Sequence, residues 1–191
     1  MNFISKIKWL KKRFTWNYKY AIGKWNYMGD EENRYNAIVE FIKATKIEKP
    51  RILDLGCGYG ALCKYLNAND YSYFFGVDLS DTAIFKARKR KYHNSKFVVS
   101  DIQKFDLDEK FDVIVFNEVL YYLDNPMKSV ERFEKNNENL YFIFSFYGGR
   151  EDLINELAQK YQLINKQLVI KKENQANWGI SIFKVNNITQ N

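Results

Sequence analysis

Residues 51–62 read Arg-Ile-Leu-Asp-Leu-Gly-Cys-Gly-Tyr-Gly-Ala-Leu, an apolar run that changes into alternating glycines and then into a helix-like pattern. The apolar part, residues 52–55, predicts a buried strand that carries Asp54 to its carboxyl end. Three glycines follow it and allow a sharp turn close to a ligand: Gly56, Gly58 and Gly60. Because open α/β sheets bind ligands beyond such strand ends, this stretch predicts a cofactor site.

Three further apolar runs also end in polar residues. Residues 73–77 precede Asp78, residues 96–100 precede Asp101-Ile102, and residues 111–116 precede Asn117-Glu118. We expect these strand ends to gather on one rim around one nucleoside, where Asp78 can accept both ribose hydroxyls. Taken alone, the glycine turn also fits a dinucleotide fingerprint, which leaves NAD as a competing ligand.

The order and spacing of these motifs resemble those of the class I S-adenosylmethionine-dependent methyltransferases. The family's first motif is similar to residues 53–60, its second strand ends in an acid like Asp78, and its third ends like Asp101-Ile102. Its fourth strand opens like residues 111–114. The resemblance covers about residues 36–185. It implies an α/β, Rossmann-like fold: a seven-stranded, mainly parallel sheet with helices on both faces and an N-terminal helical extension.

The resemblance also implies residues that bind S-adenosylmethionine and its product S-adenosylhomocysteine. Asp54 would help to hold the ammonium group, and the turn from Gly56 to Gly60, including Cys57 and Gly58, would lie under the methionine part. The remaining positions would be Asp78 at the ribose, Asp101 at the adenine amine, Leu79 and Ile102 on either side of the adenine ring, and Asn117 at the methionine end. The alternative for Asp78 and Asp101 is capping of a following helix.

Chemistry is expected directly after the fourth strand. Many small-molecule O-methyltransferases of the family resemble Glu-Val-Leu-Glu-His there, but this chain has Tyr121 and Tyr122, so we predict neither a histidine base nor a metal site. An amine acceptor needs only to be neutral, whereas a hydroxyl acceptor needs a base, for which Glu118 is the candidate. The alternatives are a structural role for Glu118 and packing for the two tyrosines.

Residues 118–123, Glu-Val-Leu-Tyr-Tyr-Leu, resemble the corresponding segment of nodulation-factor N-methyltransferases. The whole chain resembles small methyltransferases of glycan assembly, which implies methyl transfer to an amino or hydroxyl group of a sugar or glycan precursor. An RNA or protein methyltransferase remains an alternative. So does a non-catalytic binding module that keeps the fold as a partner surface.

The composition predicts a folded, reduced protein. The 191 residues, 46% of them apolar, suit a single domain of ordinary size. The two cysteines, Cys57 and Cys63, form no CxxC pair, and with His93 as the single histidine they cannot build a zinc cluster. We therefore expect a cytoplasmic protein without a metal, with an N-terminal arm over residues 1–30 and a methyltransferase domain over residues 31–191.

The arm carries the net charge of +7, because residues 1–29 hold seven Lys/Arg and no acid while the remaining charges cancel. Four apolar residues are spaced for one face of a helix: Phe3, Ile7, Leu10 and Phe14. This face either packs on the domain or caps the cofactor site, lies on the inner membrane surface, or accompanies binding to nucleic acid or another polyanion. We expect three aromatic residues to close the site: Trp25, Tyr27 and Tyr35. No run of 18 apolar residues predicts a membrane span.

The remaining chain alternates strand and helix patterns, which predicts a mainly parallel sheet. A helix is expected to begin at Asp30 as its N-cap. Further helices are predicted near residues 58–67, 80–91, 126–135 and 151–161. Later strands are predicted at residues 140–146, 166–171 and 179–185.

Overall fold

The computed structural model describes residues 3–106, 109–134, 137 and 139–185. Within this part, seven strands form one sheet in the order β3-β2-β1-β4-β5-β7-β6. The strands are β1 (Arg51–Leu55), β2 (Tyr73–Asp78), β3 (Ser95–Val99), β4 (Val113–Asn117), β5 (Tyr141–Tyr147), β6 (Gln162–Ile170) and β7 (Asn177–Lys184). The first five run parallel, and β7 and β6 complete the sheet in antiparallel pairing. The predicted seven-stranded, Rossmann-like fold is confirmed.

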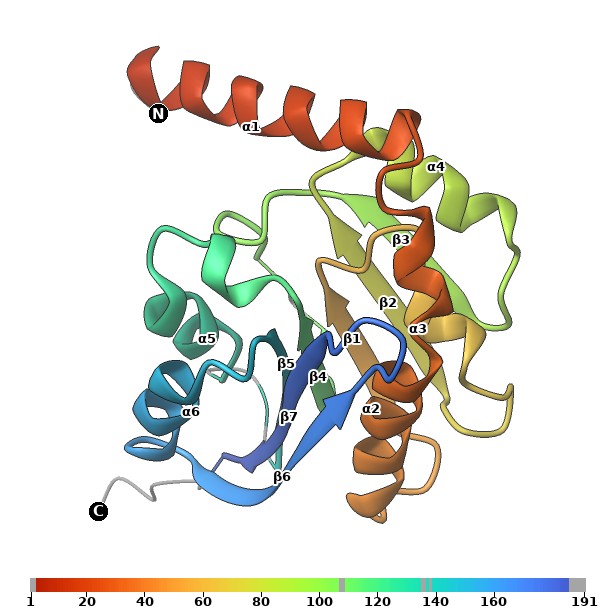
Figure 1. Cartoon of the computed structure of the whole chain (residues 1–191), viewed down its shortest axis with the longest axis vertical. Coiled ribbons are helices and arrows are strands. Elements are labelled where there is room, and N and C mark those ends of the chain that lie inside the picture. The colour runs from red at the N-terminus through yellow and green to blue at the C-terminus, as the bar shows by residue number, and fades with distance from the viewer. Residues whose placement is uncertain (1–2, 107–108, 135–136, 138, 186–191) are drawn as a thin grey trace.

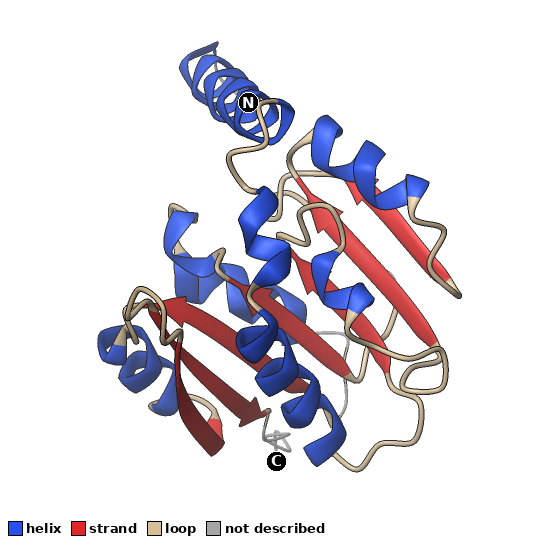
Figure 2. Ribbon diagram, turned by 45° about the vertical axis from the view of Figure 1, so that its right-hand side comes forward, coloured by secondary structure: helices blue, strands red, loops and turns tan. Residues whose placement is uncertain are grey.

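Helices cover both faces of the sheet (Figures 1 and 2). The α-helices are α1 (Phe3–Ala21), α2 (Glu32–Ala44), α3 (Ala61–Lys64), α4 (Asp81–Lys89), α5 (Pro126–Glu134) and α6 (Glu151–Ala158). Two short 3-10 helices, η1 (Asn26–Asp30) and η2 (Leu120–Tyr122), lie between them. One face of the sheet packs with α2, α3 and α4, and the other with α5 and α6.

The two cores follow from the alternation of side chains along buried strands. In β1, Ile52 points to the face of α2, whereas Leu53 and Leu55 point to the face of α5. In β5, Ile143 belongs to the first core and Phe142 to the second. A strand that is buried on both sides reads as a continuous apolar run, which is why the sequence predicts these strands well.

The strand order reverses between β1 and β4, because the chain builds outward first through β2 and β3 and then through β4 and β5. Such a switch point leaves a crevice at the carboxyl ends of the strands, where α/β sheets bind ligands. Helix α1 lies across this end of the sheet, at the top of Figure 1. The fold therefore places the glycine turn after β1 beneath the N-terminal arm.

Three local predictions need correction. The helix predicted from residue 58 begins only at Ala61, because Gly60 before it takes a left-handed φ of 76°. Asp30 does not cap α2: it ends η1, and the N-cap position falls on Glu31, which makes no side-chain capping bond. The strand predicted at residues 166–171 is longer, since β6 begins at Gln162 and pairs with β7 through an irregular register near Asn165.

Gly76 in the middle of β2 supports the glycine turn. A Cβ atom at this position would lie 2.5 Å from Phe97 Cδ1 and 2.8 Å from Cys57 Sγ. We predict that Gly76→Ala lowers the free energy of unfolding in urea by about 1 to 3 kcal/mol, because the strand has no room for the methyl group. The cost should be smaller when Phe97 is already shortened by Phe97→Leu. Equal costs in both backgrounds would contradict the proposed clash.

Candidate functional site

Polar contacts fasten α1 to the rest of the chain. Arg13 donates two hydrogen bonds to the Asp81 carboxylate at 2.6 and 2.8 Å, and Asn17 Nδ2 donates to the same carboxylate at 3.0 Å. Lys12 Nζ donates to the backbone carbonyl of Tyr122 at 2.7 Å. Because these partners lie in α4 and η2, α1 bridges two separate edges of the crevice.

The predicted apolar row of α1 forms but faces outward. Phe14 is 74% exposed and Leu10 48%, and Ile7 is exposed as well; the side chain of Phe3 lies outside the described part. The interpretation in which this row packs on the domain is therefore wrong for these residues. The polar contacts above fix the rotation of the helix, so Trp16 and not Phe14 turns toward the sheet.

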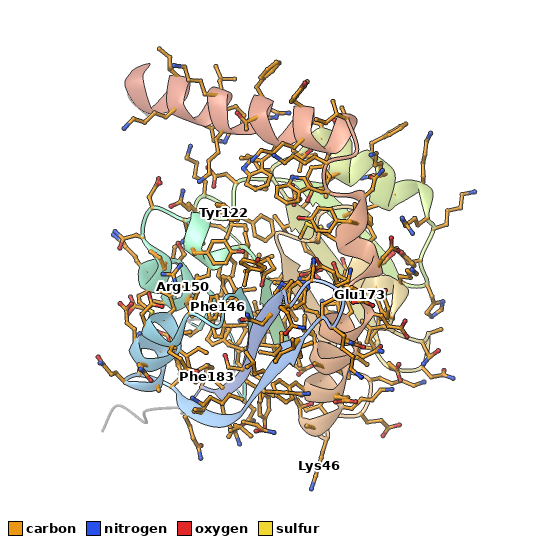
Figure 3. All side chains as sticks on the ribbon, in the orientation of Figure 1. Lys46, Tyr122, Phe146, Arg150, Glu173 and Phe183 are labelled. Carbon is orange, nitrogen blue, oxygen red and sulfur yellow. The ribbon has the colours of Figure 1, made fainter. Side chains whose placement is uncertain are left out.

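A pocket of about 640 Å³ lies between α1 and the strand ends. It is lined by residues at or just after the ends of all five parallel strands, together with parts of α1, η1 and the β6–β7 loop. In Figure 3, Tyr122 lies beneath α1, while Lys46 projects from the opposite end of the molecule. Six of the predicted cofactor residues line the pocket: Gly56, Asp78, Leu79, Asp101, Ile102 and Asn117. All three predicted catalytic residues line it too: Glu118, Tyr121 and Tyr122.

Asp78 ties the glycine turn to the end of β2. Its Oδ2 accepts a hydrogen bond from the Gly58 N–H at 2.9 Å, and its Oδ1 accepts one from the Ser80 N–H at 2.8 Å. Ser80, not Asp78, caps α4, because its Oγ accepts from the Ala83 N–H at 3.1 Å. Burial raises the pKa of Asp78 to about 6, although these backbone N–H groups oppose the rise. The capping interpretation of Asp78 therefore does not apply.

Asp54 lies buried beneath the glycine turn and does not itself line the pocket. Only 1% of the residue is exposed, and its Oδ1 has no hydrogen-bond partner within the described part of the chain. Burial raises the pKa of Asp54 to about 7; the nearby Asp78 carboxylate raises it further, and the Arg34 guanidinium opposes the rise. A buried carboxylate oxygen without a partner is a natural neighbour for a cationic ligand group.

The glycine turn contacts the N-terminal arm directly. Gly58 has a φ of 55°, and a Cβ atom there would lie 2.7 Å from Tyr20 Oη. A Cβ atom at Gly56 would lie equally close to Val119, in the segment after β4. Cys57 is buried, and burial raises the pKa of its thiol well above the ordinary value, which favours packing over reactivity.

Asp101 makes a local turn at the end of β3. Its Oδ1 accepts a hydrogen bond from the Gln103 N–H at 3.1 Å, and Lys104 Nζ lies 3.8 Å from its Oδ2. No helix of the described chain begins at this turn, so Asp101 is not a helix cap either. Its position on the pocket wall, between β3 and Ile102, leaves it available to a ligand.

Glu118 is fully engaged by its neighbours. Its Oε1 accepts from Ser145 Oγ at 2.7 Å, and its Oε2 accepts from Tyr121 Oη at 2.6 Å and from the Tyr147 N–H at 3.1 Å. The residue adopts a left-handed φ of 57° that turns its side chain back across β5. Because both oxygens are occupied, this arrangement favours the structural interpretation: Glu118 joins β4 to β5 and orients Tyr121.

A buried arginine that the sequence analysis missed connects α2 to β4. Arg34 is 0% exposed; its Nη2 donates to Glu31 Oε2 at 2.5 Å and its Nη1 donates to Asn117 Oδ1. Its guanidinium lies 4.5 Å from the ring of Tyr35. A signal was present, because Arg34 stands four residues before Ile38 and so lies on the same apolar face of the helix.

Glu31 was also missed, and it lines the pocket. It is 8% exposed, and its Oε2 is held by Arg34. Among the described residues, none forms a hydrogen bond with its other oxygen, Oε1. Burial raises the pKa of Glu31, while the neighbouring Arg34 guanidinium opposes the rise. The pocket is therefore lined by Glu31 as well as by Glu118, Asp78 and Asp101, and Glu31 differs from Glu118 in having one oxygen without a hydrogen bond from the described residues.

Aromatic side chains form much of the remaining wall: Trp16, Tyr20, Trp25, Tyr27, Tyr121, Tyr122, Tyr147 and Trp178. Trp16 packs edge-on against Tyr122 with 5.2 Å between ring centres, and it stacks on Trp25 at 5.9 Å. Arg150, Lys171 and Asn174 complete this side of the pocket.

Tyr35, which was expected to close the site, lies elsewhere. It is 3% exposed and stacks on Tyr65 with 4.9 Å between ring centres. The reason is its place on the buried face of α2, directly after Arg34. Trp25 and Tyr27, the other two residues of the predicted lid, do line the pocket.

The family model described as a methyltransferase domain matches residues 47–188. The chain belongs to this family. The class I S-adenosylmethionine-dependent methyltransferase family predicted from the motifs is thus confirmed. Within the described residues of this methyltransferase, no three His, Cys, Asp or Glu side chains are grouped so as to hold a metal ion.

Two relatives and two solved structures place the methyltransferase more closely. A malonyl-(acyl-carrier protein) O-methyltransferase of Halalkalibacterium halodurans is 34% identical over 135 residues, which cover 66% of this chain and 49% of that protein. Nodulation protein S of Rhizobium tropici is 41% identical over 73 residues, which cover 37% and 30% of the two chains. The chain spans about half the length of the curated relatives it matches first.

The N-methyltransferase NodS of Bradyrhizobium japonicum, solved with S-adenosylhomocysteine, superposes with a TM-score of 0.69 at 19% identity and covers 81% of this chain and 86% of its own. The magnesium protoporphyrin IX methyltransferase of Synechocystis, solved with bound S-adenosylmethionine, gives 0.68 at 17% identity, with 83% and 81% covered. Both likenesses show the shared fold, and the predicted resemblance to nodulation-factor N-methyltransferases is confirmed.

Asp54 is expected to make the stability of the methyltransferase depend on pH. Its folded-state pKa of about 7 lies above the unfolded value near 3.8. Between these two pH values the folded state therefore holds a proton that the unfolded state has lost. We predict that the free energy of unfolding of the ligand-free protein falls by about 2 to 4 kcal/mol as the pH rises from about 4 to about 8.

Asp54→Asn should remove most of this slope in urea unfolding measured across the range, whereas Asp70→Asn, which removes a half-buried carboxylate whose pKa is lowered and not raised, should not remove it. The pKa of Asp78 is raised as well, so Asp78 accounts for the part of the slope that remains. A slope that survives Asp54→Asn in full would contradict the assignment.

Proposed function

We propose that the protein transfers a methyl group from S-adenosylmethionine to an amino or hydroxyl group of a sugar or glycan precursor, with an amino group favoured. The observation that carries this proposal is the position of Glu31. Its carboxylate is held by Arg34, leaves one oxygen available and faces an aromatic-walled pocket next to Asn117. The substrates named for the relatives are properties of those proteins, and they support this proposal only by similarity.

The residues on the cofactor side fit S-adenosylmethionine. The unpartnered Oδ1 of Asp54 suits the ammonium group, and the glycines leave the backbone of the turn uncovered by side chains. Asp78 and Asp101 lie at the ends of the adjacent strands β2 and β3 and line the same pocket, which suits a ribose and an adenine bound along one rim. When bound, S-adenosylmethionine supplies a methyl group on a positively charged sulfur, so a neutral nucleophile can displace it directly.

The other side of the pocket suits a sugar. The flat rings of Trp16, Tyr122 and Trp178 offer apolar surface for the C–H faces of a pyranose, and their polar edges can hydrogen-bond its hydroxyls. Pockets of this kind fix orientation with few polar groups, here Glu31 and Asn117. Methyl transfer depends mainly on such positioning and on the exclusion of water.

The two glutamates that line the pocket have different roles in this proposal. Glu118 accepts hydrogen bonds on both oxygens, from Ser145, Tyr121 and Tyr147, so in this proposal it orients Tyr121. Glu31 is free on one side and can bind the N–H or ammonium group of an amine through a charge-assisted hydrogen bond. An amine also needs no strong base, since it reacts once it is neutral. These differences favour an amino group over a hydroxyl group as the acceptor.

We propose a cytoplasmic location with peripheral contact at the inner membrane surface through the N-terminal arm. The two cysteines are free and buried, as suits a reducing compartment. The described helices include none with both the length and the apolar character that crossing a bilayer requires. The basic arm lies beside the pocket, so an acceptor carried on a lipid would meet the site there.

The cofactor assignment is tested by calorimetry with S-adenosylhomocysteine and, separately, NAD. We expect micromolar binding of S-adenosylhomocysteine alone, and at least about tenfold weaker binding by Asp78→Asn, which loses charge next to the ribose and at the glycine turn. Asp70→Asn, at a turn remote from the pocket, is the control. Binding of NAD in preference, or equal affinity in the two variants, would rule out the proposed cofactor site.

The acceptor assignment is tested with radiolabelled S-adenosylmethionine and paired sugars such as glucosamine and glucose. We expect transfer to the amino sugar, and a KM for it that rises by about ten- to a hundredfold in Glu31→Gln, because a charge-assisted hydrogen bond is lost. Glu32→Gln is the matched control, because Glu32 is the next residue in the chain and its side chain is exposed.

Unchanged affinity of Glu31→Gln for S-adenosylhomocysteine would separate an acceptor role from a loss of the cofactor site. If Glu31→Gln retained a wild-type kcat/KM for the amino sugar, the proposed role of Glu31 would be wrong. Transfer to no member of an amino-sugar panel, with cofactor binding intact, would reject the acceptor class alone.

A further inference from the structure

The outer face of α1 carries a continuous row of exposed apolar side chains. Ile7, Leu10, Phe14 and Tyr18 follow one another at spacings of three or four residues, which places them on one side of the helix. Phe14, in the middle of the row, is the most exposed large apolar side chain in the described chain, at 74%. The row continues past the helix end to the exposed Ile22.

This row is exposed because the opposite side of the helix makes the contacts with the domain. Lys12, Arg13 and Asn17 hold η2 and α4 by hydrogen bonds, while Trp16 and Tyr20 face the pocket. The inner and outer sides of α1 are therefore distinct, and the exposed row is not needed to attach the helix.

Positive charge accompanies the row. Lys8 and Lys11 are exposed beside it, and residues 1–29 contain no acid to offset them. Within the described part of the arm, the two best-anchored cations, Lys12 and Arg13, point the other way, toward η2 and α4. An apolar stripe bordered by lysines matches the interfacial layer of a bilayer that contains anionic lipids.

We propose that the outer face of α1 docks on an anionic lipid bilayer, with Leu10, Phe14 and Tyr18 inserted at the headgroup level. This inference rests on the peripheral contact proposed above and is independent of the acceptor. A second copy of the chain is a poorer partner, because two arms without acids would bring like charges together. Nucleic acid is a poorer partner too, because large apolar side chains make up most of this face and only Lys8 and Lys11 accompany them.

The position of the helix gives this docking a consequence for the site. Lys12, Trp16 and Tyr20 of α1 belong to the pocket wall. A bilayer bound to the outer face would therefore lie one helix diameter from the pocket, within reach of an acceptor whose reactive head group projects from a lipid anchor.

The experiment is co-sedimentation of the intact protein with vesicles of phosphatidylglycerol and phosphatidylcholine, compared with vesicles of phosphatidylcholine alone. We expect binding to the anionic vesicles, at least about tenfold weaker binding to the neutral ones, and a similar loss of anionic binding in Phe14→Ser. Reversing the edge charges with Lys8→Glu and Lys11→Glu should weaken anionic binding as well.

Leu168→Ser is the matched control, since Leu168 is 59% exposed on β6, at the far edge of the sheet, and should bind like the wild type. Binding of S-adenosylhomocysteine by each variant reports on folding and separates a failed docking surface from a failed cofactor site.

Failure of the intact protein to sediment with anionic vesicles would overturn the proposal, and so would undiminished binding by a folded Phe14→Ser variant. A dimer seen by light scattering and lost in Phe14→Ser would assign the face to a second copy instead. Salt-dependent binding of poly(U) without vesicle binding would assign it to nucleic acid.

Discussion

A guanidinium with no access to solvent holds the site together. Arg34 reaches from α2 to Glu31 at the helix start and to Asn117 at the end of β4, while its flat face lies against Tyr35. A buried charge is costly unless its hydrogen bonds are made, and breaking such a pair costs about 3 to 5 kcal/mol. The pocket wall beside Glu31 and the end of β4 are consequently fixed relative to each other.

Much of the fold could be predicted from the sequence because the patterns that specify its strands are local. Strands β1, β2, β4 and β5 are buried on both faces, so each appears as an unbroken apolar run between turn residues. Strands at the edge of the sheet were harder to predict from the sequence. The antiparallel β6 is exposed along most of its length, so its sequence carries little apolar pattern, and its first residues were missed. Asp30 was a misleading signal for the start of α2, because the N-cap position falls on Glu31, whose carboxylate is held by Arg34 one helical turn further on.

The pocket residues at the strand ends were predictable for the same reason, since they follow strand ends at fixed places in the chain. The acceptor side was not, because it is assembled from segments far apart in sequence: Trp16, Glu31, Tyr147 and Trp178 meet only in the folded chain. Glu118 illustrates the limit most clearly. The sequence offered it as a base or a structural group with equal reason, and only its contacts with Ser145 and Tyr147 distinguish the two.

Tyr20 belongs at once to the arm and to the surroundings of the glycine turn, because its hydroxyl occupies the space beside Gly58. Coupling between two binding events is reciprocal, so a ligand that binds the glycine turn more tightly when Tyr20 is in place would hold the arm in place by the same factor. Tyr20 is the side chain through which the arm and the turn would be coupled.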